Sequence, residues 1–402
     1  MAEKQSSRLI SFLWHNSAVV GITMSTTLIF GFATLYLHDF INVSNFMVGV
    51  AASLSHVISV ILSPLAGTLS DNTWTPWGRR RPYILAGSIL AALCVAAMPH
   101  TLNYWVFLLL VSLFFTFSVA YQIPFYALIP EMSGEGRRGA YSTFTGLLRL
   151  LGAALVLGFG GWFWAKNPAW LFYLTAFVIV FTAAITFISV REDRGGELPD
   201  QDKISIFKNF RRYMRDLVSQ KKILLFFAAQ FFWWLGLGSL MPFATIMLKE
   251  LYGVEVSELF RLGPGVIIGA VLLIGAIVAA GALGDRWGHR QIVTVGLVSL
   301  TIGSVIAFFF RDLTMFYVAA LFVVVGAAPL FNEPFALLAE LVPKGREGEF
   351  YGLDTISITL SQVPASLLGG AIIDAFGYTS VYLLVTSTSL IAILLMWLKS
   401  RV

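Results

Sequence analysis

Charged residues are scarce in this chain. Of its 402 residues, 12% are charged and 57% are hydrophobic. Soluble domains carry about 25% charged residues. A chain with half that share has too few charges to cover a surface that faces water, so much of its surface must face lipid. The composition therefore excludes an ordinary soluble protein and indicates a membrane protein.

Cysteine is almost absent as well, and histidine is rare. Cys94 is the single cysteine and lies in an apolar run, which excludes a disulfide framework and a paired thiol site. The five histidines show no metal-binding spacing. The sequence also lacks a Gly-x-Ser-x-Gly elbow and a phosphate-binding glycine loop. We therefore predict a protein that is not an enzyme and that uses neither a cofactor nor a metal.

Long apolar runs are abundant. About twenty apolar residues cross a bilayer as a helix, whose backbone polar groups bond one another. Such runs occur near residues 12–36, 44–69, 82–99, 103–130, 140–164, 168–190, 223–248, 263–284, 291–310, 313–339, 350–373 and 378–398. The sequence therefore predicts an all-α polytopic membrane protein with twelve transmembrane helices. We expect the first run to be retained as a span, because it lacks the small-residue cleavage site of a signal peptide.

The basic residues are distributed unevenly between the loops. If both termini lie in the cytoplasm, the inner loops hold most of the 27 lysines and arginines. This asymmetry is the positive-inside pattern of membrane proteins. It predicts cytoplasmic termini in an inner or plasma membrane. It also accounts for the net charge of +5 by topology, so we expect the lipid bilayer as a partner and no nucleic acid.

Two segments of the chain recur about 210 residues further on. Gly67 to Asp71, followed by Trp77 and Gly78, has its counterpart in Gly281 to Asp285, followed by Trp287 and Gly288. The Ala-Leu pair at 127–128 with Glu131 recurs at 336–337 with Glu340. Two matches in register indicate two related halves. The predicted domains are a six-helix bundle at 1–190, a basic linker with a short amphipathic helix at 191–222, and a second bundle at 223–402.

The segment from Ser63 to Ile84 carries a family resemblance. Its Gly-x-x-x-Asp and Gly-Arg-Arg-Arg strings resemble the signature loop of the major facilitator superfamily. The fuller string is similar to the sucrose-transporter and glycoside–pentoside–hexuronide symporter branch. The resemblance implies two pseudo-symmetric six-helix bundles that transport by alternating access, with a solute site between related halves. The chain departs from sucrose carriers in having Tyr126 where they have arginine, and from melibiose-type relatives in having His56 and no acid in the second span.

Charges gather at the predicted inner ends of spans in both halves. Carboxylates and guanidinium groups on one face form charge-assisted hydrogen bonds, often in pairs. The resemblance implies that this cluster is a conformational latch; alternatively, its members are surface ion pairs that contribute little. The predicted cytoplasmic gate comprises Asp71, Arg79, Arg80, Arg81, Glu131, Arg137, Asp285, Arg286, Arg290, Glu340 and Arg346.

Few ionisable residues lie within the predicted spans, and Glu333 is the strongest candidate for proton coupling. An ionisable group at membrane depth is expected to be functional. Glu333 lies in the tenth span, which lines the cavity in the resembled superfamily, and loss of water there favours a protonated carboxyl group. Alternatively, it is a structural partner of Arg149. Glu131 is the second coupling candidate, since it stands where sucrose carriers have an acid.

Each presumed cavity helix also carries one amide, and aromatic residues accompany most of them. Hydroxyl groups of a sugar pair with amides, while its apolar face packs on aromatic rings. Ordinary hydrogen bonding between helices is the alternative for each amide. The predicted solute-binding residues are Asn16, Gln122, Tyr126, Arg149, Gln230, Trp233, Trp234 and Asn332.

Three functions are compatible with these residues. The first is a proton symporter, acting as a monomer, for a small solute such as a sugar or glycoside. The second is a proton-driven exporter of an amphipathic compound, for which the 34 phenylalanines would form the cavity. The third is a membrane protein that chaperones a lipid or pigment without transport. A gate repeated in both halves speaks against the third, because a static scaffold has no need of one.

Overall fold

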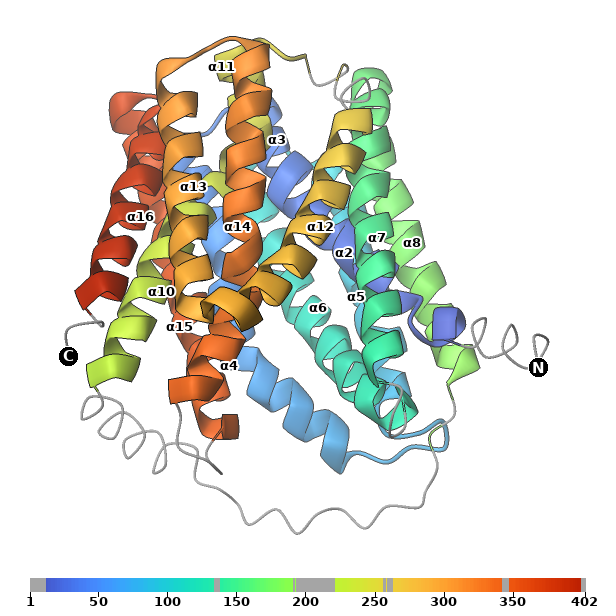
Figure 1. The fold of residues 1–402 in the computed structure, drawn as a ribbon. Coiled ribbons are helices and arrows are strands. Elements are labelled where there is room, and N and C mark those ends of the chain that lie inside the picture. The colour runs from blue at the N-terminus through green and yellow to red at the C-terminus, as the bar shows by residue number, and fades with distance from the viewer. Residues whose placement is uncertain are drawn as a thin grey trace. The chain divides into compact units, whose positions relative to one another are not determined.

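The computed structural model describes residues 12–133, 138–190, 192, 221–255, 258, 263–341 and 347–398, and nearly all of them are helical (Figure 1). The first half contains α2 (Ala18–Thr27), η1 (Leu28–Ala33), α3 (Thr34–Tyr36), η2 (Leu37–Ile41), α4 (Asn45–Asn72), α5 (Arg81–Ala97), η3 (Met98–His100), α6 (Tyr104–Ser133), α7 (Arg138–Lys166) and α8 (Pro168–Ser189). The second half contains α10 (Lys221–Leu240), η4 (Met241–Phe243), α11 (Ala244–Tyr252), α12 (Gly263–Trp287), α13 (His289–Phe309), α14 (Leu313–Leu341), α15 (Glu347–Phe376) and α16 (Ser380–Leu398).

Eleven helical stretches of the described residues are long and apolar enough to cross a membrane. They correspond one by one to the predicted spans, except at the eighth position. There the helix α12 covers the predicted run 263–284 but is not among the eleven. The predicted class, an all-helical polytopic membrane protein, is confirmed.

The first span differs most from its prediction. It covers Ala18–Ile41 rather than 12–36, and it ends at Asn42, whose φ of 56° is left-handed. Its segments Leu28–Ala33 and Leu37–Ile41 are π-helical. A π-helical turn widens the helix and is frequent at functional sites. Polar residues lie at both boundaries, His15 to Ser17 before the span and His38 and Asp39 within its last turn, so hydropathy locates the ends of this span only to within several residues.

The contacts divide the chain into two units. Unit 1 comprises Met1–Arg194, Pro242–Lys249 and Gly253–Ile267, and unit 2 comprises Gly195–Met241, Glu250–Tyr252 and Ile268–Val402. Within unit 1, the Thr245 hydroxyl donates to the Gly31 carbonyl at 2.5 Å, and Lys249 Nζ lies 2.7 Å from the Asp39 carboxylate. The predicted linker 191–222 lies outside the described residues apart from Glu192 and its last two positions.

Glycine allows α5 and α6 to pack closely in unit 1. A Cβ atom at Gly87 would lie 2.9 Å from Tyr121 Cβ and 3.0 Å from the Phe117 carbonyl oxygen. Real Cβ atoms are not found that close to other atoms, so any larger residue here would push the helices apart. Small residues at such crossings are typical of membrane helices, because they let backbones approach.

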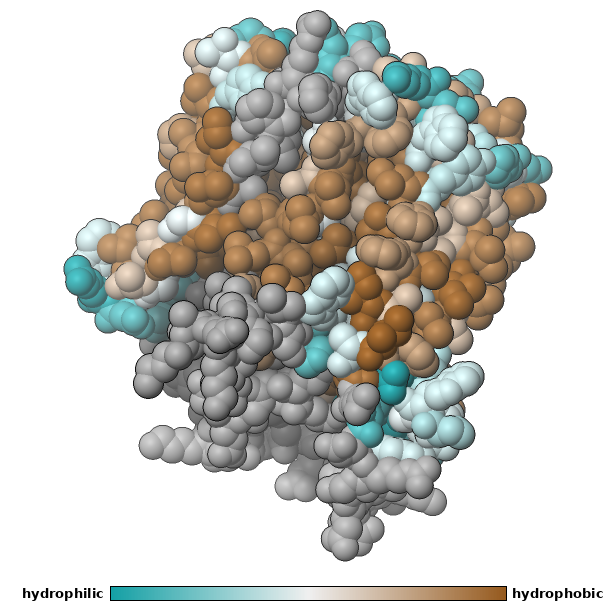
Figure 2. Space-filling view, turned by 90° about the vertical axis from the view of Figure 1, so that its right-hand side faces the viewer, coloured by the Kyte–Doolittle hydropathy of each residue, from teal (hydrophilic) through white to brown (hydrophobic). Residues whose placement is uncertain are grey.

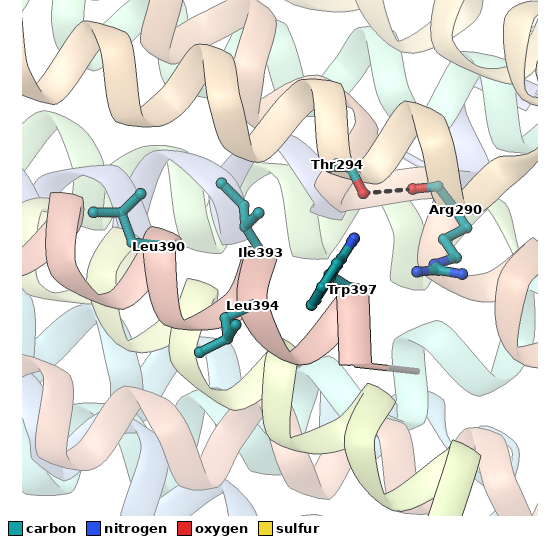
Figure 3. A pocket seen from close by; sticks show the side chains of 6 residues that line it. All are labelled: Arg290, Thr294, Leu390, Ile393, Leu394 and Trp397. Atoms are coloured by element: carbon teal, nitrogen blue, oxygen red, sulfur yellow. Dashed lines mark hydrogen bonds between the residues drawn. The ribbon is translucent and has the colours of Figure 1, made fainter. Parts of the chain in front are cut away.

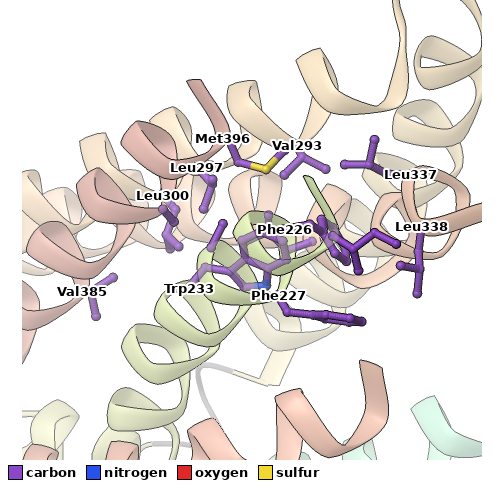
Figure 4. Packing of buried hydrophobic residues seen from close by; sticks show 14 residues of the cluster. Phe226, Phe227, Trp233, Val293, Leu297, Leu300, Leu337, Leu338, Val385 and Met396 are labelled. Atoms are coloured by element: carbon purple, nitrogen blue, oxygen red, sulfur yellow. The ribbon is translucent and has the colours of Figure 1, made fainter. Parts of the chain in front are cut away.

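Unit 2 has an apolar core built from four helices. The side chains of α10, α13, α14 and α16 interdigitate in it (Figure 4). Trp233 lies at the centre with 0% of its surface exposed, and the Phe226 ring packs edge-on against it at 6.2 Å between centroids. Burial of rings of this size contributes much of the packing energy of a core. The core therefore fixes the direction in which α10 presents its remaining residues.

The outer surface of several helices is apolar, as a lipid-facing surface must be. Figure 2 shows one face on which hydrophobic side chains cover the middle and hydrophilic ones lie toward the rim. Exposed large apolar residues occur on α7 and α8, among them Phe159, Trp162, Phe177, Phe181 and Ile188. In water such a surface would aggregate, whereas in a bilayer it meets acyl chains.

Candidate functional site

The charge cluster at the inner end of unit 1 centres on Arg80. Its side chain is 7% exposed, and its Nε and Nη2 atoms donate to one oxygen of Asp71 at 3.1 and 2.8 Å. Its Nη1 atom donates to the Ala127 carbonyl on α6 at 2.7 Å. Arg79 lies further off, with Nε at 4.0 Å from the Asp71 carboxylate. Arg80 thus ties α4, α5 and α6 together through a single guanidinium group.

Glu192 is a member of this cluster that the sequence analysis missed. Its carboxylate accepts hydrogen bonds from the backbone N–H groups of Arg79, Arg80 and Arg81 at 2.9 to 3.1 Å. These N–H groups open α5, and a negative charge is favoured at a helix N-terminus. The signal available in the sequence was weak: Glu192 is one of two adjacent acids just after the sixth span, within a mixed run of charges.

Arg81 turns away from the acids. Its Nε atom donates to the Phe187 carbonyl at 2.8 Å, and its guanidinium lies 4.4 Å from the centre of the Phe187 ring. Arg81 therefore joins α5 to α8. All these contacts lie within unit 1, so the cluster holds one bundle together at its inner end.

The second copy of the cluster is more open. Asp285 has a side chain that is 79% exposed, and Arg286 is exposed too. Arg290 donates to the Met396 carbonyl on α16. Of the other predicted gate residues, Arg137 and Arg346 lie outside the described residues. Glu131 and Glu340 lie on α6 and α14, but the structure does not describe their side chains.

Glu333 is buried and paired with a histidine. It is 1% exposed, and its Oε2 atom lies 2.7 Å from His289 Nδ1. His289 opens α13, while Glu333 lies on α14. Arg149, the alternative structural partner predicted for Glu333, has no part in this contact. In the repeated segment, His289 occupies the position that Arg79 has in the first half. This replacement of an arginine by a histidine is the feature of the sequence that could have pointed to His289.

Arg149 and Tyr126 come together in unit 1. The Arg149 guanidinium lies 5.4 Å from the centre of the Tyr126 ring, and its side chain is exposed although it belongs to a span. Arginines within spans face a bundle interior or a water-filled cavity, because exposure to lipid is costly. Among the described residues, no carboxylate forms an ion pair with Arg149. The pair thus offers a cation and an aromatic face to a polar ligand.

Two of the predicted amides have partners within unit 1. Asn16 is fully buried; its Nδ2 atom donates to the Phe12 carbonyl at 3.0 Å, and its Oδ1 atom accepts from the Thr145 hydroxyl at 3.1 Å. Gln122 is half-buried and donates to the Ser118 hydroxyl at 2.5 Å, within its own helix. Asn16 therefore links the turn before α2 to α7, as a structural hydrogen bond between helices does.

The residues predicted on α10 divide between core and polar site. Trp233 belongs to the apolar core described above, which gives it a packing role. Gln230 is fully buried, and neither of its amide atoms has a hydrogen bond of ordinary geometry within the described residues. The Asp354 carboxyl of α15 lies beside it. Trp234 packs its ring against Phe331 at 5.2 Å between centroids, and its Nε1 atom is buried without a partner in the described part of the chain.

The predicted tenth-span amide, Asn332, lies on α14 beside Glu333, and its side chain is not described. A cavity of about 260 Å³ lies elsewhere in unit 2, at the ends of α13 and α16 (Figure 3). Its lining consists of Arg290, Thr294, Leu390, Ile393, Leu394 and Trp397. Apart from Arg290 of the predicted gate, no candidate residue lines it, so we do not assign the solute to this cavity.

Buried charged and polar groups inside bundles of membrane-spanning helices are typical of polytopic transporters. The chain belongs to the family described as MFS/sugar transport protein, which it matches over residues 15–398. Membership of the major facilitator superfamily confirms the predicted resemblance and the multi-pass membrane location.

Relatives and solved structures agree on the fold. The multidrug resistance protein MdtG of Salmonella paratyphi C (strain RKS4594) is 24% identical, over 98% of this chain and 96% of the relative. The D-xylose–proton symporter has a similar structure, with a TM-score of 0.73, 15% identity, and coverage of 96% of this chain and 97% of that one. The nucleoside transporter NupG is similar too, with a TM-score of 0.75, 10% identity, and coverage of 98% and 99%.

Proposed function

We propose that this transporter carries a small polar solute, such as a sugar or glycoside, together with protons by alternating access. The observation that carries this proposal is the pair of Arg149 and Tyr126, an exposed guanidinium beside an aromatic face within the spans of unit 1. Guanidinium N–H groups donate to hydroxyl or carboxylate oxygens, and the ring accommodates the apolar face of a sugar.

Unpaired polar groups in unit 2 support the same class of solute. The Trp234 indole N–H is buried without a hydrogen-bond partner in the described residues, and the buried Gln230, whose amide has no hydrogen bond of ordinary geometry there, lies beside the carboxyl group of Asp354. An unpaired buried polar group costs about 1–3 kcal/mol. Hydroxyl groups of a solute would satisfy these donors and acceptors, whereas an apolar compound would leave the cost in place.

Proton coupling is assigned to Glu333 within this proposal. An ionisable group within a span is expected to be functional, and Glu333 is 1% exposed there. Glu131 stays the second candidate by its position alone. The charge clusters around Arg80 and around Asp285 are proposed as parts of the cytoplasmic gate.

Export of an amphipathic compound is the second candidate function. It is favoured by the relative MdtG, which carries the words multidrug resistance in its name and aligns with 98% of this chain. The family description, MFS/sugar transport protein, favours the sugar instead. Fold alone cannot decide between them, because one fold hosts many substrates.

The test is uptake into proteoliposomes that contain the purified protein. A panel of labelled mono- and disaccharides and one lipophilic cation are each offered with and without an inward proton gradient. We expect a sugar to accumulate under the gradient. Arg149→Gln removes the guanidinium group and should weaken transport of that sugar by about 10- to 100-fold, because a charged hydrogen bond of about 1.5–3 kcal/mol is lost.

Two controls sharpen this test. Arg149→Lys keeps the charge but not the planar fork, so it should retain more transport than Arg149→Gln. Trp233→Phe changes a core residue and should leave the preference among sugars unaltered. Gradient-driven movement of the cation, with no sugar transported, would replace the proposal with the exporter.

A further inference from the structure

The surroundings of Glu333 contain more than a single hydrogen bond. His289 joins two carboxylates through its two ring nitrogens. Nδ1 lies 2.7 Å from the buried Glu333 carboxylate, and Nε2 lies 3.8 Å from Asp285 Oδ1. The Asp285 side chain is 79% exposed, whereas that of Glu333 is 2% exposed. The imidazole thus stands between an acid in contact with solvent and an acid without it.

The backbone of α12 encloses the pair on one side. A Cβ atom at Gly284 would overlap the Glu333 carboxylate and would lie 2.6 Å from His289 Nδ1. Only glycine leaves room for the two groups to meet. Gly284 immediately precedes Asp285, so one turn of α12 supplies both the space for the buried pair and the exposed acid.

We propose that His289 is a proton relay between the inner aqueous side and Glu333. The inference rests on the proposed proton coupling, and it identifies the residue through which the proton reaches the buried acid. Histidine suits this task because its two nitrogens can bind and release a proton on opposite sides of the ring near neutral pH.

One proton moves along the hydrogen bond between His289 and Glu333. The N–H bond at His289 Nδ1 breaks, and an O–H bond forms at Glu333 Oε2. The imidazolium and carboxylate thereby become a neutral imidazole and a neutral carboxyl group, and the total charge does not change. The imidazolium forms beforehand, when a neutral imidazole protonated at Nδ1 takes a proton from hydronium at Nε2, where Asp285 stabilises the positive charge. After the transfer to Glu333 the ring keeps that proton at Nε2.

Two neighbouring arginines have other surroundings or partners. Arg286 on α12 is exposed, and Arg290, one residue after His289, donates to the Met396 carbonyl on α16. From the described part of α12, α13 and α14, the carboxylates that contact the imidazole are Asp285 and Glu333. Nδ1 faces the Glu333 carboxylate and Nε2 faces Asp285, so each side of the ring has an acid beside it.

The test separates net proton-coupled accumulation from exchange of solute at equal concentrations, which needs no net proton transfer. His289→Gln keeps an amide donor toward Glu333 but cannot transfer a proton. We expect its gradient-driven accumulation to fall by about 100-fold, the lower range for a positioned proton-transfer group, while exchange stays within about threefold of wild type. Gly284→Ala should act in the same direction, and Gly275→Ala on the same helix, where a Cβ meets no atom within 4 Å, is the matched control.

A second measurement does not depend on the solute. Purified protein in nanodiscs is shifted to lower pH, and proton uptake is followed with an indicator dye. Wild type should show a fast uptake phase that is absent in Glu333→Gln and about 100-fold slower in His289→Gln. His100→Gln, at a histidine that bonds Tyr173 in unit 1, should behave as wild type.

The outcomes are distinguishable. If wild type moves no sugar but retains the His289-dependent fast phase, the proposed substrate fails and the relay stands. If His289→Gln takes up protons and accumulates solute as wild type does, the relay is overturned. If accumulation and exchange fall equally and the fast phase persists, His289 has only a structural role, and the relay is overturned as well.

Discussion

Replacing Arg80 tests whether the inner charge cluster stabilises unit 1. The guanidinium is 7% exposed and, among the described residues, donates two hydrogen bonds to Asp71 and one to the Ala127 carbonyl. Removing one member of a buried ion pair costs about 3–5 kcal/mol. Because the Asp71 side chain is 34% exposed, water can take over part of its solvation. We therefore expect Arg80→Ala to lower the free energy of unfolding by about 2–3 kcal/mol.

The assay is reversible chemical denaturation in mixed micelles, followed by tryptophan fluorescence. Arg80→Lys should lose about 1 kcal/mol less than Arg80→Ala, because an ammonium group can keep the ion pair but not the bond to Ala127 as well. A double-mutant cycle with Asp71→Asn isolates the pair itself, and we expect a coupling of about 1 to 2 kcal/mol.

Arg286 provides the matched control, since it belongs to the second copy of the cluster and is exposed. Arg286→Ala should change the free energy of unfolding by less than about 0.5 kcal/mol. Equal effects at Arg80 and Arg286 would refute the reasoning, because they would show that burial of the guanidinium contributes nothing.

Three further predictions concern other contacts. Glu192→Gln should lower the free energy of unfolding by about 1 kcal/mol, since it removes the charge that caps α5; no change in denaturation would contradict this role. Gly87→Val should destabilise unit 1 by more than about 2 kcal/mol by overpacking, whereas Gly158→Ala, where a Cβ meets no atom within 4 Å, should be neutral or stabilising in the same assay. Gln230→Leu should raise the thermal stability of the solute-free protein, because it removes buried amide atoms that have no hydrogen bond of ordinary geometry in the described residues, and it should weaken solute transport. A loss of stability would show that the amide is satisfied, with the Asp354 carboxyl as its neighbour.

Features that repeat along the chain could be predicted from the sequence. Spans were predictable because a lipid-facing helix must be apolar over its whole length. The related halves were visible because charged loops at inner ends recur with their glycines. The major facilitator fold followed from these two patterns together with the resemblance of the loop after the second span.

Side-chain contacts between helices could not be predicted in the same way. A membrane-spanning helix is apolar on most faces, so the sequence of α10 does not show which of Trp233 and Trp234 enters the core. Gln122 bonds a serine of its own helix, which no count of amides reveals. The partner of Glu333 lay in a segment interpreted as a gate, where His289 was noted only as part of a repeated string.

The π-helical segments of the first span also affect how related chains are compared. A residue added inside a helix rotates the part of the helix that follows it by about 100° relative to the part that precedes it. Ser17, before both π-helical segments, bonds Thr182 and Thr186 of α8, while Tyr36, between them, stacks on Phe107 of α6 and meets Phe172 of α8 edge-on. An alignment that moves all length differences into loops would shift one end of this span onto the wrong face. Gaps between this chain and its relatives therefore belong within Leu28–Ala33 or Leu37–Ile41 wherever a relative has an uninterrupted α-helix.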